Sequence, residues 1–192
     1  MKEQRNAVML HGSGRSHNSY WFPYLDTNLQ SRGFSVARPE LPNPDQPSLE
    51  NQLPVALQQN YTERTVLIAH SVGSPLALSV LEHINIRIHL AILVAGYSTP
   101  LSRFVEETKP TVQASYDWKR IAQNVGDLYF INSDNDPWGC TDEKGREMLE
   151  AAGKGSLIIR KGDGHMGSDQ FSQPYPEFPL ILGLIDSAII RP

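Results

Sequence analysis

The chain has 192 residues, which is enough for one domain with a hydrophobic core and marginal for two. It is 40% hydrophobic and 20% charged, and 17 Lys and Arg against 21 Asp and Glu give a formal net charge of -4. This composition is typical of a globular protein, and with no block of basic residues the charge argues against nucleic acid or an anionic membrane as a partner.

Six short apolar runs rich in β-branched residues are spaced along the chain. Most of them do not alternate apolar with polar residues, and such continuous runs predict strands buried on both faces, as in a parallel sheet. The predicted strands cover residues 7–10, 34–37, 65–69, 90–95, 128–132 and 157–160.

Longer segments between these runs carry apolar residues at helical spacing. They predict helices over residues 20–32, 72–83 and 142–152. Residues 178–190 predict a C-terminal helix packed on the core, because the segment is shorter than the roughly 20 apolar residues of a membrane span and contains Pro179 and Asp186. The alternation predicts one domain over residues 1–192, a doubly wound and mainly parallel sheet of about six strands with helices on both faces.

Two segments interrupt the pattern. Residues 38–54 contain five prolines, and we expect a surface loop there rather than a linker between domains, since one strand before it could not build a core. Residues 96–110 are also irregular and are expected to cover a site.

Ser71 lies where the third predicted strand meets the following helix. A serine nucleophile can be presented on a strained strand-to-helix turn, which needs small residues two positions before and two after it. Here these residues are Ala69 and Gly73. Pro75 would fall in the first helical turn, where its missing N–H costs little. Ser71 could equally cap the helix, so the turn alone leaves both interpretations open.

Later residues supply candidates for a base and an acid. In this architecture the catalytic order is Ser, then Asp or Glu, then His. Of the six histidines, His165 follows the last predicted strand, in a glycine-rich loop where a base would have to lie. The loop after the fifth predicted strand offers two acids. We favour Asp136 because it precedes a Pro-Trp turn, and Asp134 remains an alternative that could instead cap the loop.

An oxyanion formed by attack of a serine needs two backbone donors. Val72, which follows the serine, would supply one N–H group. The second is expected from the loop after the first strand, where we assign Ser13, with Gly12 next. A phosphate cradle in this loop is disfavoured, because its glycines match neither the dinucleotide nor the P-loop pattern. Arg15 in the same loop could meet a substrate carboxylate, and a solvated role is the simpler interpretation.

Ligands bind outside the carboxyl ends of the strands in open α/β sheets. Possible pocket residues near these ends are His70, Tyr97, Trp138, Met166 and Trp21. For each of them alone, ordinary packing is the simpler interpretation. Cys140 is interpreted as a small buried filler, and no ligand spacing predicts a metal or cofactor. As the single cysteine, it also favours a reducing compartment, so a cytoplasmic location is expected.

Taken together, these motifs resemble the α/β-hydrolase superfamily. The residues that carry the resemblance are His11-Gly12-x-Gly14, Ala69-His70-Ser71-Val72-Gly73, Asp136-Pro137 and Gly164-His165. Within the superfamily the short chain is similar to the small serine hydrolases of the retinoblastoma-binding-protein-like or YdeN-like group. The resemblance implies a parallel sheet without a large lid, and Ser71, Asp136 and His165 as nucleophile, acid and base. Ala69 departs from the usual glycine of the serine turn.

The sequence therefore predicts a serine hydrolase that cleaves small carboxylic esters through an acyl-enzyme, with a small-molecule ester as its partner and no cofactor. A thioesterase or amidase would use the same residues on a different bond. A binding or regulatory protein could keep the fold without catalysis, because a fold does not guarantee an activity.

Overall fold

A computed structural model describes residues 4–14 and 16–190, so Arg15 lies outside the described residues. All six predicted strands are present, and they form one parallel sheet in the order β2-β1-β3-β4-β5-β6. Their bounds are Asn6–Leu10 (β1), Ser35–Ala37 (β2), Thr65–His70 (β3), Ile88–Val94 (β4), Val125–Ser133 (β5) and Ser156–Arg160 (β6).

The strand order reverses direction between β1 and β3. After β1 the chain crosses to one side to make β2, and it then returns to the other side of β1 to make β3. The loops that leave β1 and β3 consequently diverge at their carboxyl ends and open a crevice there. Ser71 and the glycine-containing loop of residues 11–14 follow these two strands, so the topology brings them to the same place.

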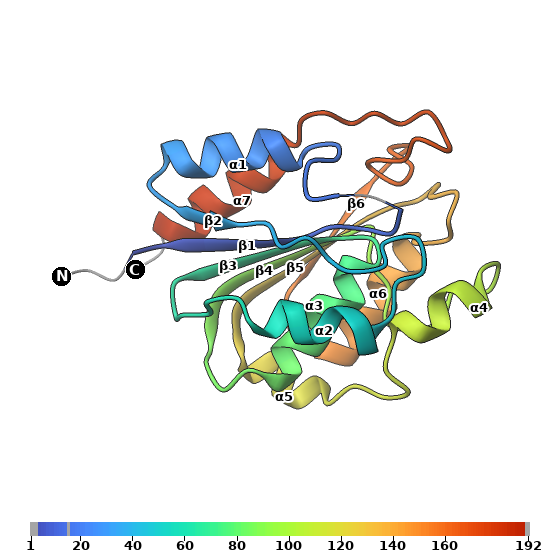
Figure 1. Cartoon of the computed structure of the whole chain (residues 1–192), viewed down its shortest axis with the longest axis horizontal. Coiled ribbons are helices and arrows are strands. Elements are labelled where there is room, and N and C mark those ends of the chain that lie inside the picture. The colour runs from blue at the N-terminus through green and yellow to red at the C-terminus, as the bar shows by residue number, and fades with distance from the viewer. Residues whose placement is uncertain (1–3, 15, 191–192) are drawn as a thin grey trace.

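Helices cover both faces of the sheet, as predicted (Figure 1). One face carries α1 (Phe22–Ser31) and α7 (Pro179–Ile190), and the other carries α2 (Leu49–Leu57), α3 (Gly73–His83), α5 (Trp118–Gln123) and α6 (Asp142–Ala152). Successive residues of β1 belong to different cores, Met9 to the one under α1 and α7 and Val8 to the one under α3. The strands are continuously apolar because both of their faces are buried.

The two irregular segments contain more structure than expected. The surface-loop prediction for residues 38–54 is wrong for its last six residues, because α2 begins after Ser48, whose Oγ accepts a hydrogen bond from the Asn51 N–H. Pro54 lies inside this helix, which buries Gln52 and Ala56. The prolines suggested a loop, but burial of one helix face outweighs the backbone bond that Pro54 cannot make.

Short helices were also missed between β4 and β5. They are α4 (Val105–Thr108), η1 (Lys109–Thr111) and α5. Each is six residues or shorter, too short to display an amphipathic period in the sequence. The Asp117 carboxylate accepts a hydrogen bond from the Arg120 N–H and so caps α5.

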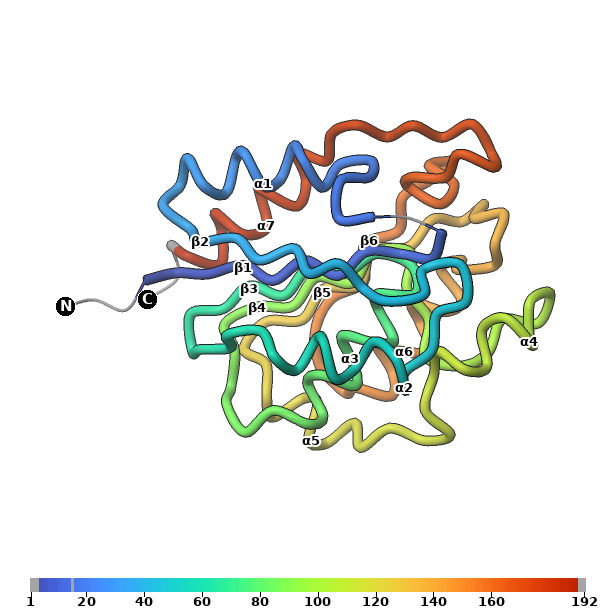
Figure 2. The backbone as a smooth tube through the Cα atoms, in the orientation of Figure 1, coloured from blue at the N-terminus to red at the C-terminus, as the bar shows by residue number. Residues whose placement is uncertain are grey.

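After β6 the chain runs through residues 161–178 and returns to α7, along the face that α1 covers (Figure 2). The C-terminal helix matches its prediction, with Ile181 and Ile185 fully buried against the sheet. Within the described part of the chain, no helix combines the length and hydrophobicity needed to cross a membrane.

Candidate active site

Ser71 adopts a left-handed backbone conformation, with a φ of 54°, in the turn between β3 and α3. Such a conformation is strained for a residue that is not glycine, and strain of this kind collects at functional sites. The turn is held on both sides, because the Ser71 N–H donates to the Val94 carbonyl at 2.9 Å and the Ser71 carbonyl accepts from the Ser74 N–H at 2.8 Å.

The helix-cap interpretation of Ser71 does not fit this geometry. Helix α3 begins at Gly73, and Val72 occupies its N-cap position with no side-chain capping bond. Gly73 must be glycine, because a Cβ there would collide with the Leu10 carbonyl oxygen on the adjoining strand. Ala69, by contrast, fits as a fully buried residue of β3, so the second small position tolerates a methyl group.

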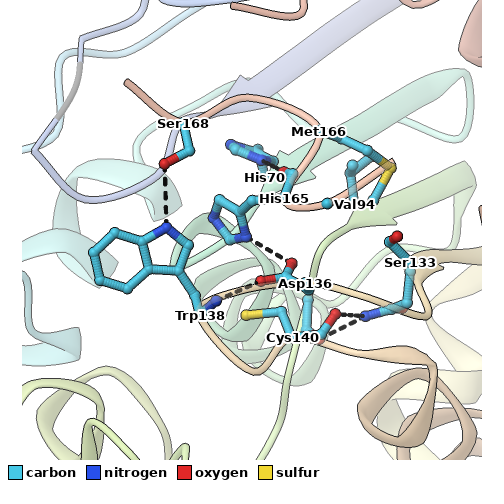
Figure 3. A network of polar contacts seen from close by, with 12 residues as sticks. His70, Val94, Ser133, Asp136, Trp138, Cys140, His165, Met166 and Ser168 are labelled. Atoms are coloured by element: carbon cyan, nitrogen blue, oxygen red, sulfur yellow. Dashed lines mark hydrogen bonds and ion pairs between the residues drawn. The ribbon is translucent and has the colours of Figure 1, made fainter. Parts of the chain in front are cut away.

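His165 and Asp136 form a buried pair. Nδ1 of His165 lies 2.7 Å from Oδ2 of Asp136, and the two side chains are 7% and 0% exposed (Figure 3). The other carboxylate oxygen of Asp136 accepts the Trp138 N–H at 2.8 Å. The carboxylate can only accept from the ring, so Nδ1 carries the proton and Nε2 is left with a free lone pair.

Asp134 has a different role from Asp136. Its Oδ1 accepts the Gly162 N–H at 2.8 Å and thereby joins the loop after β5 to the loop after β6. This is the loop-capping role that the sequence left open for it. Of the two candidate acids, the structure brings Asp136 and not Asp134 to His165.

The backbone of His165 is positioned by residues that the sequence did not single out. Gln173 Oε1 accepts the His165 N–H at 2.8 Å, and Asn135 Oδ1 accepts the Gly164 N–H at 2.8 Å. Gly164 has a φ of 59°, and a Cβ on it would collide with the Gln173 side chain. Only the glycines of this loop were visible as a signal in the sequence, because amide side chains are common in loops of every kind.

His70 contacts both the backbone and the ring of His165. Its Nε2 lies 2.9 Å from the His165 carbonyl oxygen, and the two ring centroids are 4.9 Å apart. Burial lowers the pKa of His70 to about 3, and the adjacent His165 acts in the same direction. His70 is therefore neutral at physiological pH, and its Nε2–H donates to the carbonyl. His70 was predicted only as a pocket residue, and this hydrogen bond shows that it also positions the His165 backbone.

The loop after β1 passes directly against the serine. A Cβ on Gly12 would lie 3.0 Å from the Ser71 Cβ, so a larger residue here would press against the serine side chain. The loop is fastened at its far end, where the Gly14 N–H donates to the Pro44 carbonyl. Gly12, Ser13 and Val72 all line the same cavity as Ser71, so their backbones border the position of the nucleophile.

This cavity has a volume of about 410 Å³. Among the predicted pocket residues, His70, Tyr97 and Trp138 line it together with Ser71 and His165. Met166 and Trp21 are not among its lining residues. They are fully buried in the core beneath α1 and α7, where the Trp21 indole N–H donates to the Met166 carbonyl at 2.9 Å. Their proximity to the strand ends reflects packing, the simpler of the two interpretations.

Cys140 also lines the cavity, beside the acid and the base. Burial raises the pKa of its thiol well above the ordinary value, and the charge of Asp136 acts in the same direction. One ligand atom from each of Asp136, Cys140 and His165 lies within 4.8 Å of the other two. The hydrogen bond between His165 and Asp136 is an arrangement suited to proton transfer through the ring.

Buried Asn132 ties the end of β5 to its surroundings. Its amide donates to the carbonyls of Gly96 and Cys140, at 3.0 Å each. These bonds join the loops after β4 and β5, which carry Tyr97 and Asp136. The sequence offered no sign of this role beyond the place of Asn132 at a strand end.

Residues 7–183 match the family described as Serine hydrolase. The YdeN protein of Bacillus subtilis (strain 168) is 33% identical over 138 residues, which are 69% of this chain and 71% of YdeN. The crystal structure of the B. subtilis ydeN gene product superimposes with a TM-score of 0.88 at 25% identity and covers 97% of this chain and 100% of that one.

More distant structures share the fold alone. One example is the mouse alpha/beta hydrolase domain-containing protein 10, which is 12% identical with a TM-score of 0.72. The match covers 97% of this chain and 91% of the mouse chain. The predicted doubly wound parallel architecture is thus confirmed over nearly the whole chain.

Proposed function

The chain belongs to the serine hydrolase family, as a YdeN-like α/β-hydrolase, and from this premise we propose that it cleaves small carboxylic esters with Ser71, His165 and Asp136. The observation that carries the proposal is the strained Ser71 turn in the same cavity as a histidine bonded to a buried carboxylate. A hydroxyl is a weak nucleophile unless an adjacent base takes its proton, and this arrangement supplies such a base.

In the proposed reaction, Nε2 of His165 takes the proton from the Ser71 hydroxyl as Oγ attacks the ester carbonyl. The N–H groups of Val72 and Ser13 bind the oxyanion, and Asp136 stabilises the imidazolium. The tetrahedral intermediate collapses as His165 gives the proton to the leaving alcohol oxygen. Water activated by His165 then attacks the acyl-enzyme, which releases the acid and frees Ser71.

The size of the cavity supports a small-molecule substrate. Its volume of about 410 Å³ lies toward the lower end of the range for small-ligand sites, roughly 300 to 1,000 Å³. The substrate partner is therefore proposed to be a small ester rather than a long-chain lipid. Faster turnover of a long-chain ester than of acetate or butyrate esters would contradict this part of the proposal.

Intact-mass analysis after treatment with a fluorophosphonate probe tests the nucleophile. We expect a single adduct on the wild-type protein, none on Ser71→Ala, and an unchanged adduct on Ser74→Ala, which removes a buried hydroxyl three residues along the chain. Folded wild-type protein without an adduct would overturn the proposal and favour a non-catalytic binding protein.

An ester, thioester and amide with a common acyl group then identify the bond that is cleaved. We expect the highest kcat/KM for the ester. Faster turnover of the thioester or the amide would replace the esterase assignment and leave the catalytic residues in place.

A further inference from the structure

The cavity around Ser71 is lined by both apolar and polar groups. The polar groups include Asp45, Glu107 and residues 168–170. Four large apolar or aromatic side chains also contribute, and we call them the apolar wall: Tyr97, Leu101, Phe104 and Trp138. An ester has two substituents, so an apolar wall beside only one of them can distinguish the acyl part from the alcohol part.

Trp138 is held in place from both loops of the acid–base pair. Its backbone N–H donates to Asp136 Oδ1 at 2.8 Å, and its indole N–H donates to Ser168 Oγ at 3.3 Å (Figure 3). The ring also packs against Phe104 and Phe171, with centroids 5.0 and 5.3 Å away. The indole therefore forms a fixed flat surface, and its centroid is 6.3 Å from that of His165.

The segment that carries Phe104 is internally bonded as well. Thr108 Oγ1 accepts the Leu101 N–H at 2.9 Å and donates to the Phe104 carbonyl at 2.6 Å. Thr111 Oγ1 donates to the Thr108 carbonyl at 2.7 Å and lies 2.8 Å from the Tyr97 hydroxyl. These bonds hold the apolar wall in shape without a ligand, and a preformed wall reduces the ordering cost of binding.

The chemistry of the proposed reaction orients an ester relative to this wall. His165 must reach the leaving oxygen to protonate it, so the substituent on that oxygen lies beside His165 and hence beside Trp138. We propose that the Phe104–Trp138 wall binds a flat apolar ring on the alcohol part of the substrate, which makes esters of aryl-substituted alcohols the preferred class. This inference rests on the proposed esterase function and adds the specificity of its leaving-group side.

Two isomeric esters test the orientation. 2-Phenylethyl acetate carries its ring on the alcohol, and ethyl phenylacetate carries the same ring on the acyl group. Ethyl acetate is the common reference, since its alcohol has an acidity close to that of 2-phenylethanol. We expect kcat/KM for 2-phenylethyl acetate to exceed both other values by about tenfold or more, as differences of several apolar atoms in a pocket allow. Equal values, or a preference for ethyl phenylacetate, would overturn the inference.

Variants identify the wall itself. Phe104→Leu removes the ring and keeps an apolar side chain. It should reduce the ratio of kcat/KM for 2-phenylethyl acetate to kcat/KM for ethyl acetate by about fivefold. Phe171→Ala is the matched control, because Phe171 also packs on Trp138 but is not among the residues that line the cavity. The ratio should stay near the wild-type value in this control. A ratio that is unchanged in Phe104→Leu would contradict the assignment of the wall.

Fluorophosphonate labelling of each protein separates the two proposals. A labelled wild-type protein that cleaves ethyl acetate without preferring the aryl alcohol would disprove the specificity alone. Absence of both labelling and ester cleavage would disprove the esterase function on which it rests.

Discussion

His165 Nδ1 lies 2.7 Å from Asp136 Oδ2, although the two residues are 29 positions apart in the chain. Strands β5 and β6 pair in parallel, with Ser133 opposite Arg160, so both loops leave the sheet at the same edge. The loops are then joined by Asp134, whose carboxylate accepts the Gly162 N–H. One acid of the loop thus bonds the base, and the other holds the two loops together.

This division of roles predicts different outcomes for two similar substitutions. Asp136→Asn should lower kcat by about a thousandfold or more, because an amide does not stabilise the imidazolium and favours the wrong tautomer. Asp134→Asn should change kcat by less than about threefold, since its amide oxygen can still accept the Gly162 N–H. Steady-state kinetics on one ester measures both, and equal losses in the two variants would contradict the assignment of Asp136.

A methyl group is predicted to destabilise the protein at position 73 and to stabilise it at position 69. Gly73→Ala places a Cβ against the Leu10 carbonyl oxygen, and the nearest atoms all belong to the backbone, which cannot yield as a side chain can. We expect it to lower the free energy of unfolding by about 3 kcal/mol or to prevent folding. Urea denaturation measures this change, and a Gly73→Ala protein of wild-type stability would show that the turn is looser than described.

Ala69→Gly is the counterpart of that substitution. It introduces the residue more usual at this position and removes a methyl group that is fully buried in β3. We expect the free energy of unfolding to fall by about 1 kcal/mol, because the glycine backbone is freer in the unfolded chain and a buried methyl group is lost. Fluorophosphonate labelling should be retained. Loss of labelling in the folded Ala69→Gly protein would mean that the alanine methyl group itself helps to shape the serine turn.

The buried His70 predicts a dependence of stability on pH. Its pKa is lowered from 6.5 to about 3 in the folded protein, so the unfolded chain binds a proton there that the folded chain does not. The contribution of His70 to stability is complete above pH 6.5 and is lost as the pH falls from 6.5 towards 3, by about 2 kcal/mol at pH 5.

His70→Gln should flatten this dependence, because glutamine can donate to the His165 carbonyl but does not titrate. Urea denaturation at pH 5 and pH 8 gives the comparison. If the free energy of unfolding differs between pH 5 and pH 8 by the same amount in the wild-type protein and in His70→Gln, His70 is not the group responsible. His11, whose pKa is also lowered by burial, is present in both proteins.

The charge around the cavity predicts discrimination against anionic esters. Asp45 and Glu107 line it, and the described lining residues include no lysine or arginine. We expect kcat/KM for ethyl hydrogen succinate to fall severalfold below that for ethyl butyrate at low salt. This difference in kcat/KM, which we call the gap, should narrow above roughly 0.5 M salt, where charges more than a few ångströms apart are screened.

Paired substitutions locate the source of this discrimination. Asp45→Asn combined with Glu107→Gln should narrow the gap at low salt. Glu143→Gln on α6 removes a carboxylate that does not line the cavity and should leave the gap unchanged. A gap that is insensitive to both salt and the double substitution would indicate a steric origin.

Most of the fold was predictable because its signals are local. Each strand is a continuous apolar run, and the order of strands and long helices allows few topologies other than a doubly wound sheet. Helix α2 was hidden by Pro54, and α4 and α5 by their length. In each case the helix depends on packing against the rest of the molecule more than on its own residues.

The sequence alone predicted the order of serine, aspartate and histidine, with Ser71 and His165 at its ends, and the small residue at position 73, because chain order and glycine positions are properties of the chain itself. The tertiary structure decided which aspartate meets His165, that Ser71 is held at a φ of 54° and does not cap α3, and that Trp138 lines the cavity whereas Trp21 lies in the core. These outcomes depend on distances between residues far apart in the chain, which are set only when the strands pair and their loops pack against one another.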